Sequence, residues 1–329
     1  MITVFEMRAS TIIFNLAVSL ERPGTMLIPA NVCPIVAVTL MKAKRDIELV
    51  DIDPKTLCLD EEATMLKIAN SPEKYSGIVF VHTYGTSYRS EKFFEELKKI
   101  AANLLIIDDY GSAVPLFEPP ATAADVLIFS TGYAKYVDLG YGGYGFLQKS
   151  VRYRSERSSF NSADHDALVK EEKVALSANT KFQYRDSDWL DTRHPNTSFG
   201  RYRHSLMKNM ALRAEHQNNL NRIYEEMIPR KYHLGKEFSN WRFNVLVPEK
   251  DKLLKRIFEY KASKLFASSH YQSLKDVFAR GEDSVAAKLH QNIVNLFNNF
   301  QYTAEQARTT AWIVADYLDE AEANSRDGD

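Results

Sequence analysis

Two short polar segments each follow an apolar run and carry side chains suited to acid–base or nucleophilic chemistry. Asp108 and Asp109 end the run LLIIDD, and Lys135 lies five residues after Ser130, which ends the run VLIFS. A carboxylate at the end of a buried strand is costly unless it has a partner. Two roles for the acids therefore stay open: a helix cap or ion pair, or a carboxylate aimed into a ligand crevice.

Three glycines, Gly140, Gly142 and Gly143, follow the lysine. Glycine permits a positive φ or a close approach of two backbones, but no GK[ST] is present, so this is not a Walker A loop. Taken alone, Lys135 is read as a solvated loop lysine. Together with the acids, Lys135 suggests pyridoxal phosphate (PLP) chemistry. That chemistry requires a lysine that forms a Schiff base and an aspartate that pairs with the pyridinium nitrogen.

Alternating strand-like and helix-like segments position these residues. The predicted strands are continuously apolar, which is typical of strands covered on both faces, and they span 25–29, 47–50, 77–82, 104–107, 126–129 and 144–147. Helices are predicted between them at 33–43, 61–70 and 91–102. This order predicts an α/β fold with a mainly parallel sheet. Ligands bind beyond the C-terminal ends of such strands, here at 29–33, 82–85, 108–112 and 130–143.

The second half of the chain changes character. Residues 151–195 are highly charged and include a predicted helix at 163–180, and a long helix is predicted at 205–228, where Pro229 ends it. A second αβ unit follows, with strands at 241–247, 264–267 and 294–297 and helices at 251–262 and 284–292. Thr303 and Gln306 form a capping-box pattern that predicts the start of the last helix.

Composition narrows the class of protein. The 329 residues suffice for about two domains, and 42 Lys and Arg balance 43 Asp and Glu, so there is no basic field for nucleic acid or a membrane surface. The two cysteines exclude a disulfide scaffold and a zinc site of cysteine type, and they fit a reducing cytoplasm. No apolar run approaches the length of a membrane helix. We expect a soluble cytoplasmic protein without a metal.

From about residue 7 to residue 149 the sequence resembles the DegT/StrS family of PLP-dependent sugar-nucleotide aminotransferases. Four motifs occur in the family's order: Val50-Asp51-Ile52-Asp53, Val81-His82-Thr83-Tyr84-Gly85, Ile107-Asp108-Asp109-Tyr110-Gly111, and Phe129-Ser130 with Lys135 and Gly142-Gly143. The resemblance implies the type I fold of PLP-dependent transferases. It is α/β, with a mostly parallel sheet and helices on both faces in a large domain (residues 1–203), and a smaller α+β domain (residues 204–329).

The resemblance also assigns roles. Lys135 is implied as the Schiff-base lysine, and Asp109 rather than Asp108 as the acid that keeps the pyridine nitrogen protonated. A contact to the cofactor phosphate is implied at Ser130. The family's first phosphate-binding turn usually reads SGTAAL, and this sequence departs from it with Glu6-Met7-Arg8-Ala9-Ser10-Thr11, where we still expect Arg8 and Ala9 to bind the phosphate. Amides at a helix N-terminus hold phosphate, and an arginine adds charge there.

Four further positions depart from the family pattern. Cys33 stands where the family has an aromatic residue stacked on the cofactor ring, Ser112 where it has Gln or Glu, and Tyr141 where it has an acid. Arg201 aligns with an asparagine that reaches the partner subunit's cofactor phosphate, and a guanidinium also binds phosphate. The family's N-terminal segment of several tens of residues has no counterpart here.

Substrate contacts are expected from aromatic residues and one histidine. Tyr84 and Tyr136 could stack on a sugar or base, as could Tyr202. His270, after the run LFASS, lies where a loop of the small domain would face the substrate. A plain surface histidine is the alternative reading.

The implied activity is transfer of an amino group from glutamate or glutamine to a nucleotide-linked keto sugar, by a homodimer, in surface polysaccharide or amino-sugar biosynthesis. In the family's dehydratase branch a histidine replaces the lysine, and none lies between Ser130 and Gly143. The alternative is a catalytically inactive or cofactor-sensing relative that keeps the fold. An unrelated dinucleotide-binding enzyme would need G-x-G-x-x-G after the first strand, where the sequence reads Ala30-Asn31-Val32-Cys33.

Overall fold

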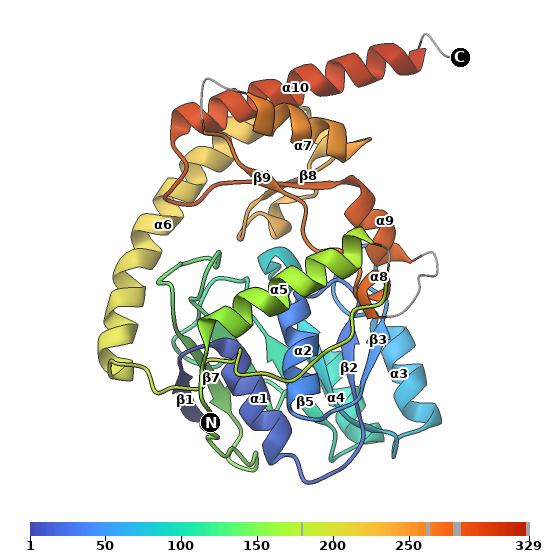
Figure 1. The fold of residues 1–329 in the computed structure, drawn as a ribbon, viewed down its shortest axis with the longest axis vertical. Helices are drawn as coiled ribbons and strands as arrows, with labels where there is room; N and C mark the ends of the chain where they lie inside the picture. Colours follow the sequence, from blue (N-terminus) through green and yellow to red (C-terminus); the bar gives the residue numbers. More distant parts are fainter. Residues whose placement is uncertain (179, 261–263, 279–283, 327–329) are drawn as a thin grey trace.

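The computed structural model describes residues 1–178, 180–260, 264–278 and 284–326. A seven-stranded sheet fills the lower part of Figure 1, and a three-stranded antiparallel sheet lies above it. The larger sheet has the order β1-β7-β6-β5-β4-β2-β3. Its strands are β1 (Ile2–Glu6), β2 (Thr25–Pro29), β3 (Ile47–Val50), β4 (Tyr75–Val81), β5 (Leu105–Asp109), β6 (Val126–Ser130) and β7 (Gly143–Leu147).

The predicted α/β fold with a mainly parallel sheet is confirmed. Of the described strands in this sheet, β7 alone runs against its neighbours, β6 and β1, and the others share one direction. The six predicted strands lie within two residues of the observed bounds. Because parallel strands end at a common edge, the segments after β2, β4, β5 and β6 meet there.

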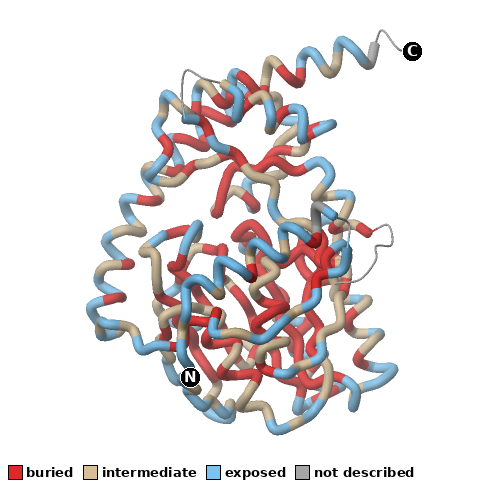
Figure 2. Tube along the Cα trace, in the orientation of Figure 1, coloured by how far each residue is buried: buried red, intermediate tan, exposed pale blue. Residues whose placement is uncertain are grey.

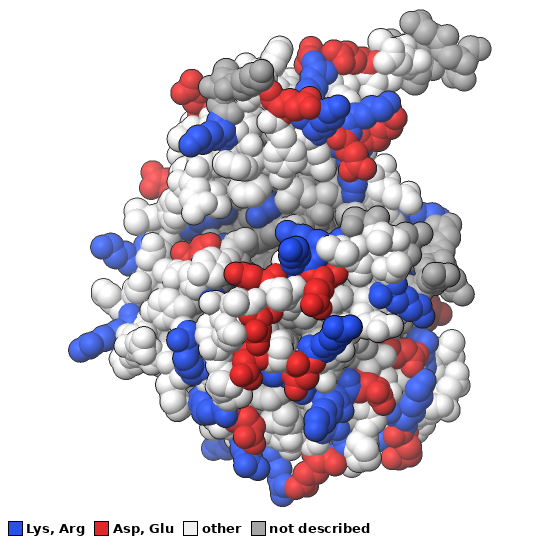
Figure 3. Space-filling model, in the orientation of Figure 1, with Lys and Arg blue, Asp and Glu red and all other residues white. Residues whose placement is uncertain are grey.

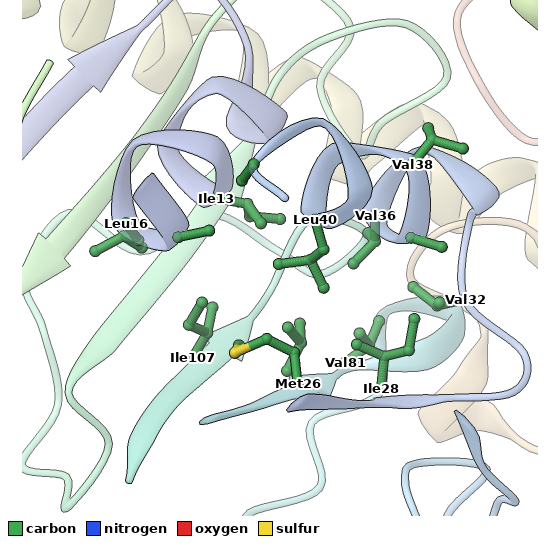
Figure 4. Packing of buried hydrophobic residues seen from close by; sticks show 14 of the residues in the cluster. Ile13, Leu16, Met26, Ile28, Val32, Val36, Val38, Leu40, Val81 and Ile107 are labelled. Atoms are coloured by element: carbon green, nitrogen blue, oxygen red, sulfur yellow. The ribbon is translucent and has the colours of Figure 1, made fainter. Parts of the chain in front are cut away.

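Helices cover both faces of this sheet. α1 (Ala9–Ser19) and α2 (Pro34–Lys42) pack on one face, and α3 (Glu61–Asn70) and α4 (Glu91–Ile100) on the other. Figure 4 shows Ile13 of α1 and Leu40 of α2 above Met26 and Ile107 of the strands. Apolar side chains therefore point both ways from each strand, which explains the absence of alternation in the sequence.

β1 and α1 are not among the predicted elements, and the charged middle segment helps to bury them. Glu6, at the end of β1, is 2% exposed. Its carboxylate accepts hydrogen bonds from Tyr153 Oη and Ser155 Oγ, both at 2.9 Å, and pairs with Arg157 at 2.6 Å. The segment after β7 thus returns to the start of the chain and satisfies a buried acid.

The upper part combines the smaller sheet with long helices. The sheet has the order β8-β10-β9, and Figure 2 shows its buried strands beneath more exposed helices. Its elements are α6 (Phe199–Met227), β8 (Phe243–Leu246), α7 (Lys250–Glu259), β9 (Ala267–Ser268), β10 (Ile293–Leu296) and α10 (Ala304–Arg326). The predicted capping box is confirmed, since the Thr303 amide donates to Gln306 Oε1 at 2.9 Å and the Gln306 amide to Thr303 Oγ1 at 3.1 Å.

Several bounds differ from the predicted ones. The long helix α6 begins at Phe199, not at residue 205, because Ser198 caps its N-terminus. α6 therefore crosses the domain boundary predicted between residues 203 and 204. The strand predicted at 264–267 is wrong in place, since β9 pairs with β10 through Ala267 and Ser268. α5 (Ser162–Ser177) ends earlier than predicted, and residues 179, 261 and 262 of the predicted helices lie outside the described residues.

Two short helices, α8 (Leu274–Phe278) and α9 (Val285–Asn292), return from the upper part to the larger sheet. The Leu274 amide donates to the Ala30 carbonyl at 2.6 Å. The Asp51 carboxylate accepts from the amides of Val285 and Ala286 at 2.8 and 3.1 Å, and so caps α9. The Val50–Asp53 motif therefore has a structural role, because Asp51 joins the larger sheet to α9 of the upper part.

None of the described helices is long and apolar enough to cross a membrane. Figure 3 shows acidic and basic side chains interspersed over the visible face, in keeping with a net charge of −1.

Candidate active site

The two acids at the end of β5 point to opposite faces of the sheet, because side chains alternate along a strand. Asp108 shares its face with Ile106 and the α3–α4 layer, whereas Asp109 shares its face with Ile107 and the α1–α2 layer. Both acids are buried. The sequence left open which of the two acids serves a ligand. The side chains that contact each carboxylate decide between them.

Asp108 is already engaged. Its Oδ1 lies 2.8 Å from His82 Nε2, and His82 Nδ1 lies 3.2 Å from the Thr86 carbonyl oxygen. The imidazole also stacks on Tyr110, with ring centroids 3.7 Å apart. Asp108 is thus held in a structural network on the far face of β5.

Asp109 instead faces the lysine. Its Oδ1 accepts the Gly111 amide at 2.7 Å. A Cβ placed on Gly111 would lie 2.8 Å from Asp109 Oδ1 and 3.6 Å from Lys135 Nζ. Carboxylate and amine therefore converge on one glycine, and any side chain there would intrude between them.

At the Asp109–Lys135 pair, burial and the neighbouring charges shift each pKa in opposite directions. Burial raises the pKa of Asp109, and the nearby Lys135 ammonium only partly offsets this. Burial lowers the pKa of Lys135, but attraction to the acidic groups of Tyr271, Cys33 and Asp109 outweighs it, so the net shift is upward. Asp109 is the carboxylic acid among these neighbours, and burial raises the pKa of both the Cys33 thiol and the Tyr271 phenol.

A second cluster lies beside this pair, where β6 ends and α1 begins. A Cβ on Gly132 would lie 3.5 Å from Arg8 Nη1 and 3.7 Å from Ser130 Oγ. Arg8 is the N-cap residue of α1, and its guanidinium donates to the Gly140 carbonyl at 2.8 Å and stacks on Tyr133. A guanidinium, a hydroxyl and the first amides of a helix, from Ala9 onward, together form an anion cradle.

The paired glycines make this cradle possible. A Cβ on Gly143 would lie 2.2 Å from the Ala9 amide nitrogen and 2.4 Å from Ala9 Cα. Gly142 has a φ of 96° and donates from its amide to the Met7 carbonyl at 2.8 Å. The glycines predicted to permit a close approach therefore do so between β7 and the first turn of α1.

The upper part contributes a wall of aromatic rings. Tyr271 interacts electrostatically with Lys135 and Cys33 and hydrogen-bonds to Ser112. Its ring stacks on Trp241 with centroids 5.9 Å apart. Trp241 donates from Nε1 to the carbonyl of Ala134, the neighbour of Lys135. Cys33 and Ser112 thus both lie beside Tyr271, an aromatic residue that the sequence analysis did not select, and their contact with a cofactor stays a prediction.

The predicted tyrosines have structural surroundings. Tyr84 is fully buried, and its hydroxyl donates to the His270 carbonyl at 2.6 Å, so it supports the loop before Tyr271. Tyr136 is buried beside Arg213 of α6, whose guanidinium donates to the Tyr136 carbonyl at 2.9 Å. In this structure neither ring offers an open face to a sugar.

Two further predicted residues are exposed. His270 stacks on Trp241 with centroids 5.7 Å apart and interacts electrostatically with Lys135, so it borders the site. Arg201 is exposed on the first turn of α6. Among the described residues no hydrogen bond or ion pair joins it to Lys135, and its role toward a partner subunit stays a prediction.

No family model matches the sequence, and no curated protein matches it. Solved structures do match over nearly the whole chain. PseC of Helicobacter pylori, an aminotransferase involved in pseudoaminic acid biosynthesis, has a TM-score of 0.69 at 14% identity, covering 97% of this chain and 87% of its own. The chain has the fold of the PLP-dependent aminotransferases.

Two other similar structures belong to the same fold. The sugar aminotransferase CalS13 of Micromonospora echinospora has a TM-score of 0.66 at 16% identity, covering 95% of this chain and 87% of its own. A DegT DnrJ EryC1 StrS aminotransferase of Brucella abortus has a TM-score of 0.64 at 15% identity, covering 96% and 86%. A fold shared at such low identity leaves the activity to be argued from the site.

Proposed function

We propose that this protein is a PLP-dependent aminotransferase of the DegT/StrS family, with Lys135 and Asp109 as its catalytic residues. One observation carries the proposal: Asp109 and Lys135 converge on Gly111 while Arg8 and Ser130 converge on Gly132, at the same sheet edge. A ring with a basic nitrogen at one end and a phosphate at the other needs this combination of groups.

The residues present fit that cofactor. Asp109 would hold the ring nitrogen, and Lys135 would hold the cofactor covalently. Arg8, Ser130 and the amides at the start of α1 would bind the phosphate. The space that a Cβ would fill at Gly111 and Gly132 is what a planar ligand needs between these groups.

When bound, PLP supplies an electron sink for bond breaking at the α-carbon of an amino acid. The protein's own groups do the rest. Asp109 would hold a proton on the ring nitrogen through its carboxylate, whose charged form the nearby Lys135 ammonium favours although burial opposes it. Lys135 would act as the nucleophile toward the cofactor and, as a free amine, would move a proton to and from the donor's α-carbon. The aromatic wall of Trp241 and Tyr271 excludes water from this reaction.

We further infer that the donor is glutamate or glutamine and the acceptor a nucleotide-linked keto sugar, in surface polysaccharide or amino-sugar biosynthesis. The similarity to CalS13, a sugar aminotransferase, and to PseC, an aminotransferase involved in the biosynthesis of pseudoaminic acid, supports an acceptor of the sugar class. A cytoplasmic homodimer, with Arg201 reaching the partner's cofactor phosphate, belongs to the same proposal.

A half-reaction tests this function. Protein loaded with PLP and freed of excess cofactor is mixed with glutamate or glutamine, and the keto acid formed is measured per site. We expect about one keto acid per site and renewed turnover when a nucleotide-linked keto sugar is added. A loaded protein that yields no keto acid from any amino donor would instead be the inactive or cofactor-sensing relative.

A further inference from the structure

Two loops at the site edge of the larger sheet each hold a residue other than glycine in the left-handed backbone conformation. Tyr84, after β4, has a φ of 56°, and Ala134, directly before Lys135, has a φ of 57°. A side chain makes this conformation unfavourable, and it persists only where surrounding contacts enforce it. The contacts made by Tyr84 and Ala134 therefore decide how the two loops present their side chains.

One short segment of the upper part, Asn240 and Trp241, binds both loops. Asn240 donates from Nδ2 to the Gly85 carbonyl at 3.0 Å, and the Trp241 amide donates to the Tyr84 carbonyl at 3.4 Å. The Trp241 indole donates from Nε1 to the Ala134 carbonyl. Gly85 has a φ of 78°, so each of the three carbonyls belongs to a residue with a positive φ. Two adjacent residues of the upper part thus hold the left-handed turns of both loops.

Ala134 is held from two sides. Its amide donates to Asp138 Oδ2 at 2.9 Å, within its own loop, whereas its carbonyl accepts from Trp241 in the other part of the molecule. Trp241 is 4% exposed and its ring stacks on Tyr271, so the indole is fixed before it meets Ala134. Lys135 follows Ala134 directly, and a change in the Ala134 backbone would therefore turn the Lys135 side chain away from the site.

We propose that Trp241 is a positioning residue for Lys135. Its indole N–H holds Ala134 in the left-handed conformation and so keeps the Lys135 amine where it can link to the cofactor. This rests on the proposed function, since Lys135 must be the reacting lysine. Trp241 acts through the backbone of Ala134 and not on the reacting atoms. Because the donor belongs to the upper part and the acceptor to a loop of the larger sheet, Lys135 is aimed only while the two parts are in contact.

Trp241→Phe tests this, because it removes the indole N–H and keeps an aromatic ring in place. The full chain, freed of cofactor, is measured in two ways. Hydrogen–deuterium exchange followed by mass spectrometry reports on the peptide that spans residues 131–140, and the rise of the visible band after PLP is added reports how fast Lys135 links to the cofactor. In Trp241→Phe we expect exchange of that peptide to be about fivefold faster and band formation about tenfold slower than in the wild type.

A matched control and a rescue separate positioning from a general loss of stability. Trp189 is also buried and donates from Nε1 to Tyr184 Oη at 3.0 Å, so Trp189→Phe removes an equivalent hydrogen bond elsewhere and should change neither measurement. Glycine adopts a positive φ without strain. Ala134→Gly added to Trp241→Phe should therefore recover most of the lost rate of band formation. If Trp241→Phe does not fold, benzothienylalanine at position 241 replaces the N–H by sulfur at nearly the same ring size and gives the same comparison.

Three results would overturn the proposal: unchanged exchange of the 131–140 peptide in Trp241→Phe, unchanged band formation in that variant, or a double variant that is slower than Trp241→Phe alone. The exchange measurement keeps this test apart from the proposed function. A wild type that forms no band of lysine-linked cofactor with PLP contradicts the function. Faster exchange of the 131–140 peptide in Trp241→Phe would still support the hold of Trp241 on this loop.

Discussion

The site edge of the larger sheet and the loop side of the smaller sheet both bury cations, but they treat them differently. At the larger sheet, attraction to acidic neighbours outweighs burial and raises the pKa of Lys135. At the smaller sheet, burial lowers the pKa of Arg242 to about 10 and of Lys250 to about 8. In the first region acidic neighbours outweigh the cost of burial, whereas in the second the cost of burial outweighs the neighbouring charges.

This difference has a functional reading. A reacting lysine must be held in place before any substrate arrives, so its acidic neighbours belong to the protein. The predictions that follow test whether the two regions separate in this way.

The largest expected effect comes from the acid of the larger sheet. Asp109→Asn removes the charge that keeps the ring nitrogen protonated, and kcat should fall on the order of 1000-fold, which is about 4 kcal/mol at the barrier. Asp108→Asn is the control, because Asp108 is occupied by His82. Its main effect should appear in thermal stability. Equal losses of kcat from both variants would show that the two acids are not functionally distinct.

The next effect concerns the anion cradle. Gly143→Ala forces a Cβ against backbone atoms of Ala9, which cannot move as a side chain can. We expect a loss of about 3 kcal/mol in the free energy of unfolding, measured by urea denaturation, together with weaker PLP binding. Gly200→Ala is the control, since its Cβ would meet nothing within 4 Å inside α6 and should be neutral or stabilising by up to about 1 kcal/mol. Similar losses in both variants would argue against the close approach.

The smallest effect is a pH dependence in the smaller sheet. The pKa of Lys250 is about 8 in the folded protein against 10.5 as its ordinary value. Between these two values the unfolded chain binds more protons, so the unfolding free energy of the wild type should rise with pH relative to that of Lys250→Met. Allowing for solvent screening, we expect a relative gain of about 1 kcal/mol between pH 7.5 and 9.5. Lys255→Met, which removes an exposed lysine of the same helix, should give no such slope; a flat difference for Lys250→Met would contradict the uncompensated charge.

The sequence predicts the strands of the larger sheet, and the edge at which the candidate site lies, because these signals are local. Asp109, Ser130 and Lys135 each follow an apolar strand within a few residues, so strand ends alone bring them to one edge. The choice between Asp108 and Asp109 needed more than strand position, because both are buried and their partners, His82 and Lys135, come from other segments.

The contacts that the smaller sheet makes with the site could not be predicted, because they are not local in the sequence. Tyr271, Trp241 and Arg242 meet the site through contacts between segments far apart in the sequence, and no spacing encodes these contacts. The hydrogen bond from Trp241 to Ala134 spans 107 positions. Tyr84 shows the converse error, since an aromatic residue after a strand suggested a ligand contact while its ring is packed in the core.

The most direct test of the catalytic assignment is the visible spectrum of the purified protein with PLP, compared with that of Lys135→Ala. We predict that the wild type shows an absorbance band of lysine-linked cofactor and that borohydride reduction fixes the cofactor covalently to Lys135, as found by peptide mass. Lys135→Ala should show neither, because Lys135 is the lysine whose amine lies at Gly111. A wild type without the band, or a variant in which borohydride still fixes the cofactor to another lysine, would contradict the site built on Asp109 and Lys135.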